Sequence, residues 1–540
     1  MAKIHGGQVI ARALRAEGVD TLFTLTGGHI VGILDGCVQE GIRIVDVRHE
    51  QTAAFAAEAY TRLTGRLGVA AVTAGPGVTN AMTGVATAFW SHTPMLLLGG
   101  RHFIRQELMG GLQEMDHPRL FEAVTKWRAT AWETGRLAEY VATAARHAFS
   151  GRGGPVFLDV PMDVQFDMVE ESAIVWPTHY RDTAAQGAMP EVVDELVGHL
   201  ARGQRPVVFA GGGFHGSGEE LTAVVEALQA PVYLNSRARG SVPYGHPLLG
   251  AHARSAAFAT ADLIVALGVD WDFRTGYGRK INPDATVIQV DAEPTRVGWN
   301  RPAHLAVVAD PAVVVAQLAG RAGDFSGDGA FAAEIMVQEA AARSARAAES
   351  GDSSSPVMPQ RFAREVSEFF GSDAIVSVDG GDIVSTTARW LQVSQAGHLL
   401  DPGPFGTLGT GAPYAIAAQV AFPDKLVGTV YGDGGFGFNG MEYDTMVRLG
   451  LPIIGVVGND GQWSNIKTFH QAFYPDRVVA ADLGVQRYDR MVAGLGGYGE
   501  FVTDPAEIGP ALERGRSSGL PALINVHLAQ TVRMSSNYSQ

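Results

Sequence analysis

Two polar turns in the C-terminal third carry the residue types that hold a metal ion and a diphosphate. The first is the run Gly-Asp-Gly-Gly at 432–435, and the second is Asn-Asp-Gly at 459–461. Each follows a short apolar run of the kind that forms a buried strand. In an open α/β sheet, ligands bind at the carboxyl ends of the strands, so the sequence predicts that these two turns meet at a ligand site.

The predicted metal ligands are all oxygen atoms. The Asp433 carboxylate, the Asn459 amide oxygen and the Gly461 carbonyl would supply them, and Mg²⁺ fills the rest of its octahedron with phosphate and water. Gly434 and Gly435 would let backbone N–H groups approach a diphosphate at a helix start. The turns therefore predict a magnesium-bridged diphosphate site; the alternative is a pair of ordinary strand-to-helix turns.

Length, charge and composition restrict the class of protein. A chain of 540 residues is too long for one hydrophobic core. Its net charge of -15 argues against binding to nucleic acid or to an anionic membrane. No apolar run is long enough to span a bilayer, and the N-terminus lacks the apolar core of a signal peptide. Cys37 is the only cysteine and is expected in the core. We expect a cytoplasmic protein.

Short β-branched runs alternate with amphipathic stretches along the chain, which predicts parallel strands joined by crossover helices. The expected fold class is therefore α/β, with three doubly wound parallel-sheet domains. Their expected bounds are 1–175, 190–345 and 356–540. An irregular segment separates the first two domains, and a polar linker with proline stops, at 348–359, leads to the third; we expect this linker to be flexible.

A second chemical motif lies in the N-terminal domain. The run 48–58 follows an expected strand, and Glu50 opens an Ala-rich helix that must pack closely. His49 and Glu50 do not begin a zinc motif, because Ala53 stands where that motif needs histidine. A buried carboxylate here suits a residue that shares a proton with a heteroaromatic nitrogen; the alternative is that Glu50 only caps its helix.

These motifs are similar to those of the thiamine diphosphate (ThDP) enzymes of the acetolactate synthase family, to which benzaldehyde lyase and the 2-hydroxyacyl-CoA lyases are related. The similarity includes the two turns, the run 48–58 and further stretches at 72–80, 153–161 and 403–411. It covers nearly all of the chain. It implies a pyrimidine-binding domain, a Rossmann-like middle domain and a diphosphate-binding domain, in that order.

The resemblance also implies roles for individual residues. Glu50 would hydrogen-bond N1′ of the aminopyrimidine ring and so promote removal of the thiazolium C2 proton. Leu408 would lie under the cofactor and bend it, and the Gly406 carbonyl would accept a hydrogen bond from N4′. The two polar turns would hold Mg²⁺ and the diphosphate. In this family the site lies between subunits, which implies a homodimer or homotetramer with Glu50 and Asp433 contributed by different chains.

Two further side chains are candidates for catalysis. Gln113 matches a glutamine near the reacting carbon of acetolactate synthases, where its amide would stabilise a developing alkoxide; alternatively, it is a polar loop residue. His29 stands where benzaldehyde lyase also has histidine, and it would relay protons near neutral pH; alternatively, it caps a glycine-rich turn.

Two glycine patterns match the spacing of a dinucleotide-binding turn. The first, at 211–216, follows an expected strand, but the next strand ends at Asn235 without the acidic residue that an NAD site needs. We therefore expect no NAD. The resemblance leaves FAD or ADP open, because the segment 272–274 is partly similar to an FAD-contacting loop of the synthases. The second match, at 494–499, is expected to be a turn because no strand precedes it.

Departures from the family pattern keep the substrate open. The synthases have lysine where this chain has Met162, and the segment 460–467 differs from the synthase form. The leading hypothesis is decarboxylation of a 2-oxo acid such as pyruvate, with carboligation to a second carbonyl. The alternatives are a 2-hydroxyacyl-CoA lyase or oxalyl-CoA decarboxylase-like enzyme, and a catalytically silent paralogue that acts as a binding or regulatory subunit.

Overall fold

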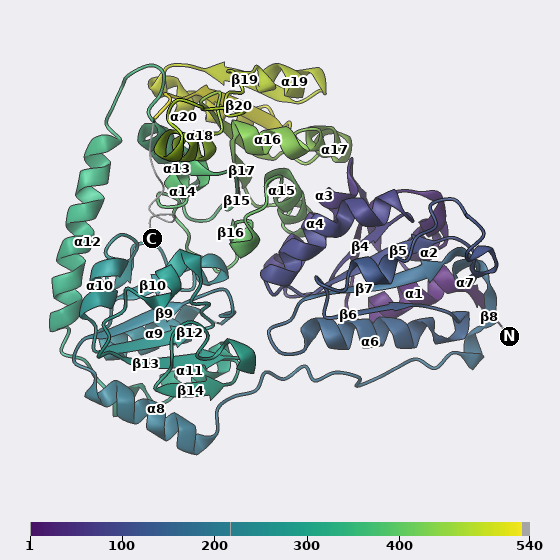
Figure 1. The fold of residues 1–540 in the computed structure, drawn as a ribbon, viewed down its shortest axis with the longest axis horizontal. Coiled ribbons are helices and arrows are strands. Elements are labelled where there is room, and N and C mark those ends of the chain that lie inside the picture. The colour runs from purple at the N-terminus through teal and green to yellow at the C-terminus, as the bar shows by residue number, and fades with distance from the viewer. Residues whose placement is uncertain (1, 217, 532–540) are drawn as a thin grey trace. The chain divides into compact units, whose positions relative to one another are not determined.

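The computed structural model describes residues 2–216 and 218–531. Their strands form three six-stranded parallel sheets (Figure 1) and a short antiparallel pair of β1 (Lys3–His5) and β8 (Met168–Glu170). No described helix is both long and apolar enough to cross a membrane. The predicted α/β class with three parallel-sheet domains is confirmed.

The first sheet has the strand order β3-β2-β4-β5-β7-β6. Its strands are β2 (Thr21–Leu25), β3 (Arg43–Asp46), β4 (Gly68–Val72), β5 (Met95–Arg101), β6 (Trp127–Thr130) and β7 (Pro155–Pro161). Its main helices are α1 (Gly6–Ala16), α2 (Val31–Gln39), α3 (Glu50–Thr64), α4 (Pro76–Trp90) and α6 (Leu137–Phe149). The apolar runs predicted every strand except β6, an edge strand whose residues are all only half-buried.

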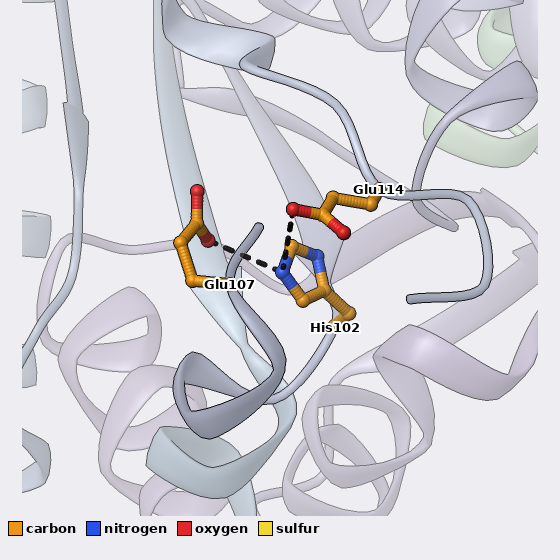
Figure 2. A group of neighbouring side chains, drawn as sticks. All are labelled: His102, Glu107 and Glu114. Carbon is orange, nitrogen blue, oxygen red and sulfur yellow. Dashed lines mark ion pairs between the residues drawn. The ribbon is translucent and has the colours of Figure 1, made fainter. Parts of the chain in front are cut away.

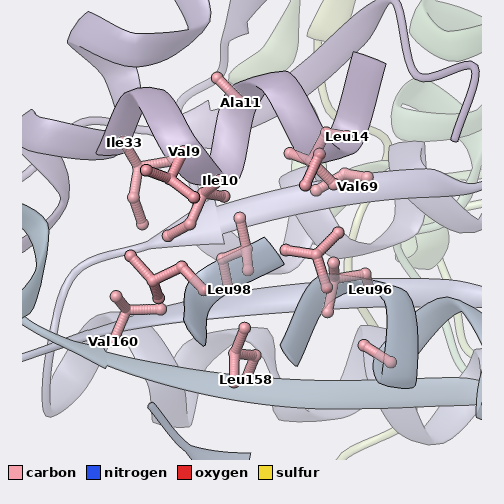
Figure 3. Packing of buried hydrophobic residues seen from close by; sticks show 14 of the residues in the cluster. Val9, Ile10, Ala11, Leu14, Ile33, Val69, Leu96, Leu98, Leu158 and Val160 are labelled. Atoms are coloured by element: carbon pink, nitrogen blue, oxygen red, sulfur yellow. The ribbon is translucent and has the colours of Figure 1, made fainter. Parts of the chain in front are cut away.

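Helix α1 covers one face of this sheet with its apolar side. Ile10 and Leu14 of α1 pack in one cluster with Leu96 of β5 and Leu158 of β7 (Figure 3). Cys37 of α2 belongs to the same cluster and is fully buried, which confirms that it is a core residue. Burial raises the pKa of its thiol to about 12 because the thiolate would lose its hydration.

The other two sheets repeat this parallel architecture. The second has the order β11-β10-β9-β12-β13-β14 and the third the order β16-β15-β17-β18-β20-β19. The strands of the second are β9 (Pro206–Ala210), β10 (Val232–Leu234), β11 (Leu249–Gly250), β12 (Leu263–Leu267), β13 (Thr286–Asp291) and β14 (Leu305–Val308). Those of the third are β15 (Ile375–Asp379), β16 (Leu399–Leu400), β17 (Val427–Gly432), β18 (Ile454–Asn459), β19 (Tyr498–Val502) and β20 (Ala522–His527).

The expected turn at 494–499 is only partly correct. Helix α19 (Tyr488–Gly494) ends at its first glycine, but strand β19 has already begun at Tyr498. A Cβ added at Gly499 would lie 2.0 Å from the carbonyl oxygen of Asp489. The last glycine of the pattern therefore lies in a strand, where it permits the close approach of helix and strand.

The linker predicted at 348–359 is shorter in the structure and is packed at its C-terminal end. Helix α12 (Ala330–Glu349) and helix α13 (Pro359–Phe370) border it. Val357 forms a parallel bridge with Leu528 and is fully buried in the core of the third sheet. The expectation of flexibility is therefore wrong for Val357, because its apolar side chain gains burial there.

The chain divides into two compact units. One contains the first sheet and takes in the segments 402–424 and 439–451; the other contains the second and third sheets. The first unit thus includes helix α15 (Gly411–Ala421) and helix α17 (Glu442–Leu449). Tyr414 of α15 donates a 2.6 Å hydrogen bond to Glu58 of α3, and both side chains are fully buried.

We expect Tyr414→Phe to lower the free energy of unfolding by about 1.5–3 kcal/mol, because the substitution removes a buried hydrogen bond to a carboxylate. Thermal and denaturant unfolding would measure the change. Tyr244→Phe is the matched control, since Tyr244 is 49% exposed. Equal stability of Tyr414→Phe and the control would show that the α3–α15 hydrogen bond contributes nothing.

Candidate functional site

Glu50 is the first residue of α3, and its carboxylate is buried, with the residue 7% exposed. The N-cap of this helix is His49, whose ring nitrogen accepts a 3.1 Å hydrogen bond from the Gln51 N–H. Asn80 of α4 donates to Oε2 of Glu50 at 3.0 Å. Capping is thus done by the neighbouring histidine, which leaves the Glu50 carboxylate to face Asn80.

Glu442 fixes the backbone just before Glu50. The Arg48 N–H donates to both Glu442 oxygens, at 3.1 and 3.2 Å, and the Thr445 hydroxyl donates at 2.6 Å. Burial raises the pKa of Glu442, and the hydrogen bonds from Thr445 and from the Arg48 N–H oppose that rise. Sequence reasoning missed this residue, because a contact between α17 and the β3–α3 turn leaves no local pattern.

A glycine turn at the start of α4 brings Glu50 and Gln113 together. Gly75 has a φ of +56°, a conformation that favours glycine. A Cβ added there would lie 2.9 Å from the Gln113 Cβ, and a Cβ added at Gly77 would lie 3.4 Å from Oε1 of Glu50. The predicted catalytic glutamine and glutamate therefore flank the same turn.

His29 reaches this turn from the other side. Its Nδ1 lies 3.0 Å from the Thr73 hydroxyl oxygen, and a Cβ added at Gly77 would lie 2.8 Å from the Thr73 methyl carbon. Burial lowers the pKa of His29, and a hydrogen bond with the Leu112 backbone partly opposes that effect. The contact with Thr73 lies outside the turn 26–30, and the role of His29 as a site residue stays a prediction.

Three buried side chains hold the glycine turn in place. The Gly75 N–H donates to Nε2 of His117 at 2.9 Å, and Nδ1 of that ring lies 2.9 Å from Asp159. Arg101 donates to the other oxygen of Asp159 at 2.8 Å. Asp159 lies in the stretch 153–161 that carried the family resemblance, but its partners are distant in sequence and could not be predicted.

Gly406 and Leu408 precede α15, in the same unit as Glu50. Gly406 has a left-handed φ of +65° and is exposed, while Leu408 is half-buried. Asn439 donates a 2.6 Å hydrogen bond to the Gly409 carbonyl and so fixes the end of this segment. Their roles toward ThDP stay predictions.

Asp433 and Asn459 lie at one edge of the third sheet, as predicted. Strands β17 and β18 are adjacent, with Gly432 level with Gly458. Asp433 is 3% exposed, and Asn459 is fully buried. Among the described residues, neither Oδ2 of Asp433 nor Oδ1 of Asn459 has a hydrogen-bond partner. Buried polar atoms are rarely left without one, so these two oxygens fit a metal ligand set.

The third predicted ligand is engaged elsewhere. The Gly461 carbonyl accepts hydrogen bonds from the N–H groups of Leu483 and Gly484, at 2.7 and 2.9 Å. A carbonyl oxygen has two lone pairs, and both have partners here. Gly461 lies next to the other two residues at the sheet edge, but its role as a ligand stays a prediction.

Negative charge gathers at this edge. Burial and, to a smaller extent, the nearby charge of Asp460 together raise the pKa of Asp433 to about 7. Burial also raises the pKa of Asp460, and bonds from Ser464 and Gln462 oppose that rise. A bound cation would offset both the burial of Asp433 and the nearby charge of Asp460. Asp460 lies in the predicted turn at 459–461, but the sequence analysis assigned it no role.

A side chain at position 434 would clash with its surroundings, and position 435 is tightly packed. A Cβ added at Gly434 would lie 2.2 Å from the Trp463 ring, and one at Gly435 would lie 3.0 Å from Oδ1 of Asp379. Asp379 ends the neighbouring strand β15, and Gly380 after it has a φ of +123°. A third glycine turn at this edge was therefore missed, although its Asp-Gly-Gly sequence is the same kind of signal.

The middle sheet ends in a cationic site. Nη1 of Arg274 donates to the Ser236 hydroxyl at 2.8 Å, beyond the end of β10. Burial lowers the pKa of Arg254, and the charges of Arg239, Arg389 and Arg274 lower it further. A Cβ added at Gly212 would lie 3.7 Å from the Ser236 side chain. The guanidinium groups thus gather near the first glycine pattern, a composition that suits an anion.

Three family models match the chain in consecutive order. They are the N-terminal TPP binding domain, the central domain and the C-terminal TPP binding domain of the thiamine pyrophosphate enzymes, at residues 4–120, 193–318 and 379–526. Each match falls on one of the three sheets. The glycine turn beside Glu50 and the oxygen pair at Asp433 lie within the two TPP binding domains.

Curated relatives extend over nearly the whole chain. A probable acetolactate synthase of Mycobacterium bovis is 41% identical over 529 residues, which are 97% of this chain and 95% of the relative. The 2-hydroxyacyl-CoA lyases 2 of Mus musculus and Homo sapiens are each 34% identical, over 98% of this chain and 90% of the relative. On these matches and on its three sheets, the chain belongs to the thiamine pyrophosphate enzyme family.

Proposed function

We propose that this protein holds ThDP through Mg²⁺, with Asp433 and Asn459 as side-chain ligands. The observation that supports this most strongly lies at the ends of β17 and β18, where two buried oxygens have no hydrogen-bond partner among the residues that the structure describes. A divalent cation satisfies both oxygens and offsets the charge that Asp433 and Asp460 bring to the same edge. The backbone N–H groups of Gly434 and Gly435, at the start of helix α16 (Asp433–Asn439), would contact the diphosphate oxygens.

Glu50 is the proposed acid–base residue. ThDP supplies a carbon nucleophile and an electron sink when it is bound. Glu50 holds a proton at the pyrimidine nitrogen, and Asn80 and Glu442 keep its carboxylate and its backbone in place. We assign to Gln113 a hydrogen bond to the substrate oxygen and to His29 the movement of its proton; the proximity of Gln113 to Gly75 and of His29 to Thr73 supports this assignment.

The proposed reaction is decarboxylation of a 2-oxo acid such as pyruvate, with carboligation to a second carbonyl. The 41% identity to a probable acetolactate synthase supports it. The runner-up is cleavage of a 2-hydroxyacyl-CoA or decarboxylation of oxalyl-CoA. The similarity to the 2-hydroxyacyl-CoA lyases favours this runner-up. Met162 also favours it, because methionine, unlike the lysine of the synthases, has no positive charge to bind the carboxylate of a 2-oxo acid. The joint presence of Glu50, Asp433 and Asn459 argues against a catalytically silent paralogue.

A substrate panel tests the reaction. Purified protein with ThDP and Mg²⁺ is incubated with 2-oxo acids, singly and in pairs, and with 2-hydroxyacyl-CoAs, and the products are identified by mass. We expect acetolactate-type products from pyruvate. Glu50→Gln should lower turnover by about 10²–10⁴-fold, as expected for the loss of acid–base catalysis, with ThDP still bound. Full turnover by Glu50→Gln would refute the role of Glu50.

Removal of one metal ligand should release the cofactor. Asp433→Asn keeps the size of the side chain but removes its charge, so we expect Mg²⁺-dependent ThDP affinity to fall by more than about 10-fold. Isothermal titration with ThDP at fixed Mg²⁺ measures it. Asp373→Asn is the matched control, with an 80% exposed side chain in the same domain. Unchanged ThDP affinity in Asp433→Asn, or ThDP binding that persists in chelator, would contradict the site.

We further propose that the middle domain binds the phosphates of FAD or ADP at the arginine cluster. Flavin absorbance of the purified protein distinguishes the two nucleotides, and mass spectrometry of the denatured supernatant identifies ADP. We expect Arg274→Gln to lose bound nucleotide, whereas the exposed Arg202→Gln should retain it. If wild-type protein carries neither nucleotide and binds neither on addition, this proposal is wrong.

Exposed apolar side chains on the Gln113 loop support a homo-oligomer. Leu108, Met109 and Leu112 are 90%, 75% and 76% exposed, and a group of large exposed apolar residues is typical of a surface that another chain covers. We propose a homodimer or homotetramer in the cytoplasm, with Glu50 and Asp433 of each site supplied by different subunits.

A further inference from the structure

A histidine and two glutamates meet at the base of the loop that carries Gln113. Nε2 of His102 lies 3.1 Å from Oε2 of Glu107 and 3.9 Å from Oε1 of Glu114. One ligand atom from each residue lies within 4.8 Å of the others. Figure 2 shows the imidazole pointing between the two carboxylates. None of the three residues belongs to the proposed ThDP and Mg²⁺ site.

The spacing of these atoms fits a small cation. Ligand bonds of about 2.0–2.2 Å to a tetrahedral zinc place neighbouring ligand atoms about 3.4 Å apart. The two distances from the His102 ring lie on either side of that value. A shift of the Glu114 side chain by a few tenths of an ångström would bring its oxygen into range, and this side chain lies on a loop.

The His102 ring is buried and lacks a hydrogen-bond partner in the part of the chain that the structure describes. The residue is 1% exposed, and neither ring nitrogen has a hydrogen-bond partner among the described residues. The Glu107 oxygen is near, but it makes no hydrogen bond with the ring. A doubly protonated ring would need an acceptor at each nitrogen, whereas a metal between the carboxylates would use the Nε2 lone pair directly.

The charge around the ring also favours a cation. Glu107 and Glu114 face it, and Asp159 lies behind Glu107 in the same network. Arg101 donates hydrogen bonds to two of these carboxylates, from Nη1 to Asp159 and from Nη2 to Glu107. Apart from the imidazole rings, these three carboxylates and one guanidinium carry two net negative formal charges, which is the charge that a divalent ion neutralises.

Hydrogen bonds from neighbouring residues orient both carboxylates. Glu114 accepts hydrogen bonds from the N–H groups of Leu108 and Gly111, and Glu107 accepts from Arg101. Each carboxylate oxygen keeps a lone pair for a metal. Both side chains are partly exposed, at 36% for Glu107 and 17% for Glu114, so an ion can enter from solvent.

We propose that His102, Glu107 and Glu114 bind a divalent transition-metal ion of the zinc class, with water in the open position. A nitrogen ligand favours Zn²⁺ or Co²⁺ over Mg²⁺. The ion would close the loop from His102 to Glu114 and fix the backbone beside Gln113. The site thus serves to position the loop, and its occupancy does not depend on the reaction proposed above.

The test uses the holoenzyme with ThDP and excess Mg²⁺, so that the oxygen site at Asp433 is occupied. Zn²⁺ is titrated by calorimetry, and Co²⁺ by its visible absorption, which is stronger for a four-coordinate site than for six oxygen ligands. We expect one site in the wild type and binding weakened by more than about 10-fold in His102→Gln and Glu114→Gln. Glu122→Gln, with a 68% exposed side chain in the same unit, should bind as the wild type does.

A second readout follows the loop itself. Hydrogen–deuterium exchange of the backbone from His102 to Glu114 should slow on addition of Zn²⁺ in the wild type but not in Glu114→Gln. Because His102 is buried, His102→Gln could fail to fold, whereas Glu114→Gln changes a residue of the surface loop and keeps the test valid. Circular dichroism and ThDP retention verify the fold of both variants. Identical Zn²⁺ titrations in the wild type and both variants would overturn the proposal and leave an ion-pair network only.

Discussion

The proposed cofactor site depends on two buried oxygen atoms that have no hydrogen-bond partner in the part of the chain that the structure describes. Each buried oxygen left without a hydrogen bond costs about 1–3 kcal/mol, and Asp433 and Asn459 each contribute one. The rest of each side chain is held: Oδ1 of Asp433 accepts from the Gly434 N–H, and Nδ2 of Asn459 donates to Gln486 and Asn525. The free oxygens are therefore aimed by bonds made elsewhere, and a ligand that satisfies them stabilises the fold as it binds.

In the first unit, too, hydrogen bonds made by neighbouring residues hold a buried carboxylate in position. Helix α3 is buried along nearly its whole length, and Glu50 at its start is positioned through its neighbours. Glu442 holds the backbone before it, Asn80 holds its carboxylate, and Tyr414 holds the helix further along at Glu58. The glycine turn at 75–77 is fixed by His117 in turn. A change in any of these contacts would therefore displace the carboxylate to which we assign the acid–base role.

Much of the fold and half of the site could be predicted from the sequence. The strands that carry Asp433 and Asn459 are continuous apolar runs, and parallel order brings their ends to one edge. The polar partners could not be predicted, because His117, Asp159 and Glu442 reach their partners across long stretches of chain. Edge strand β6 lacks an apolar run, and Gly499 joined a strand because only glycine fits against Asp489. Local sequence patterns predict helices and strands, whereas the orientation of the polar side chains depends on tertiary contacts that no local pattern shows.

The buried thiol of Cys37 has a practical consequence. Because it is the only cysteine and is fully buried, with its pKa raised to about 12, the protein presents almost no thiolate to a maleimide reagent at neutral pH. A cysteine introduced at any exposed position would then take up a dye selectively, without removal of a native thiol. Fluorophore pairs placed in this way would follow the motion of the Gln113 loop during turnover in the otherwise unaltered enzyme.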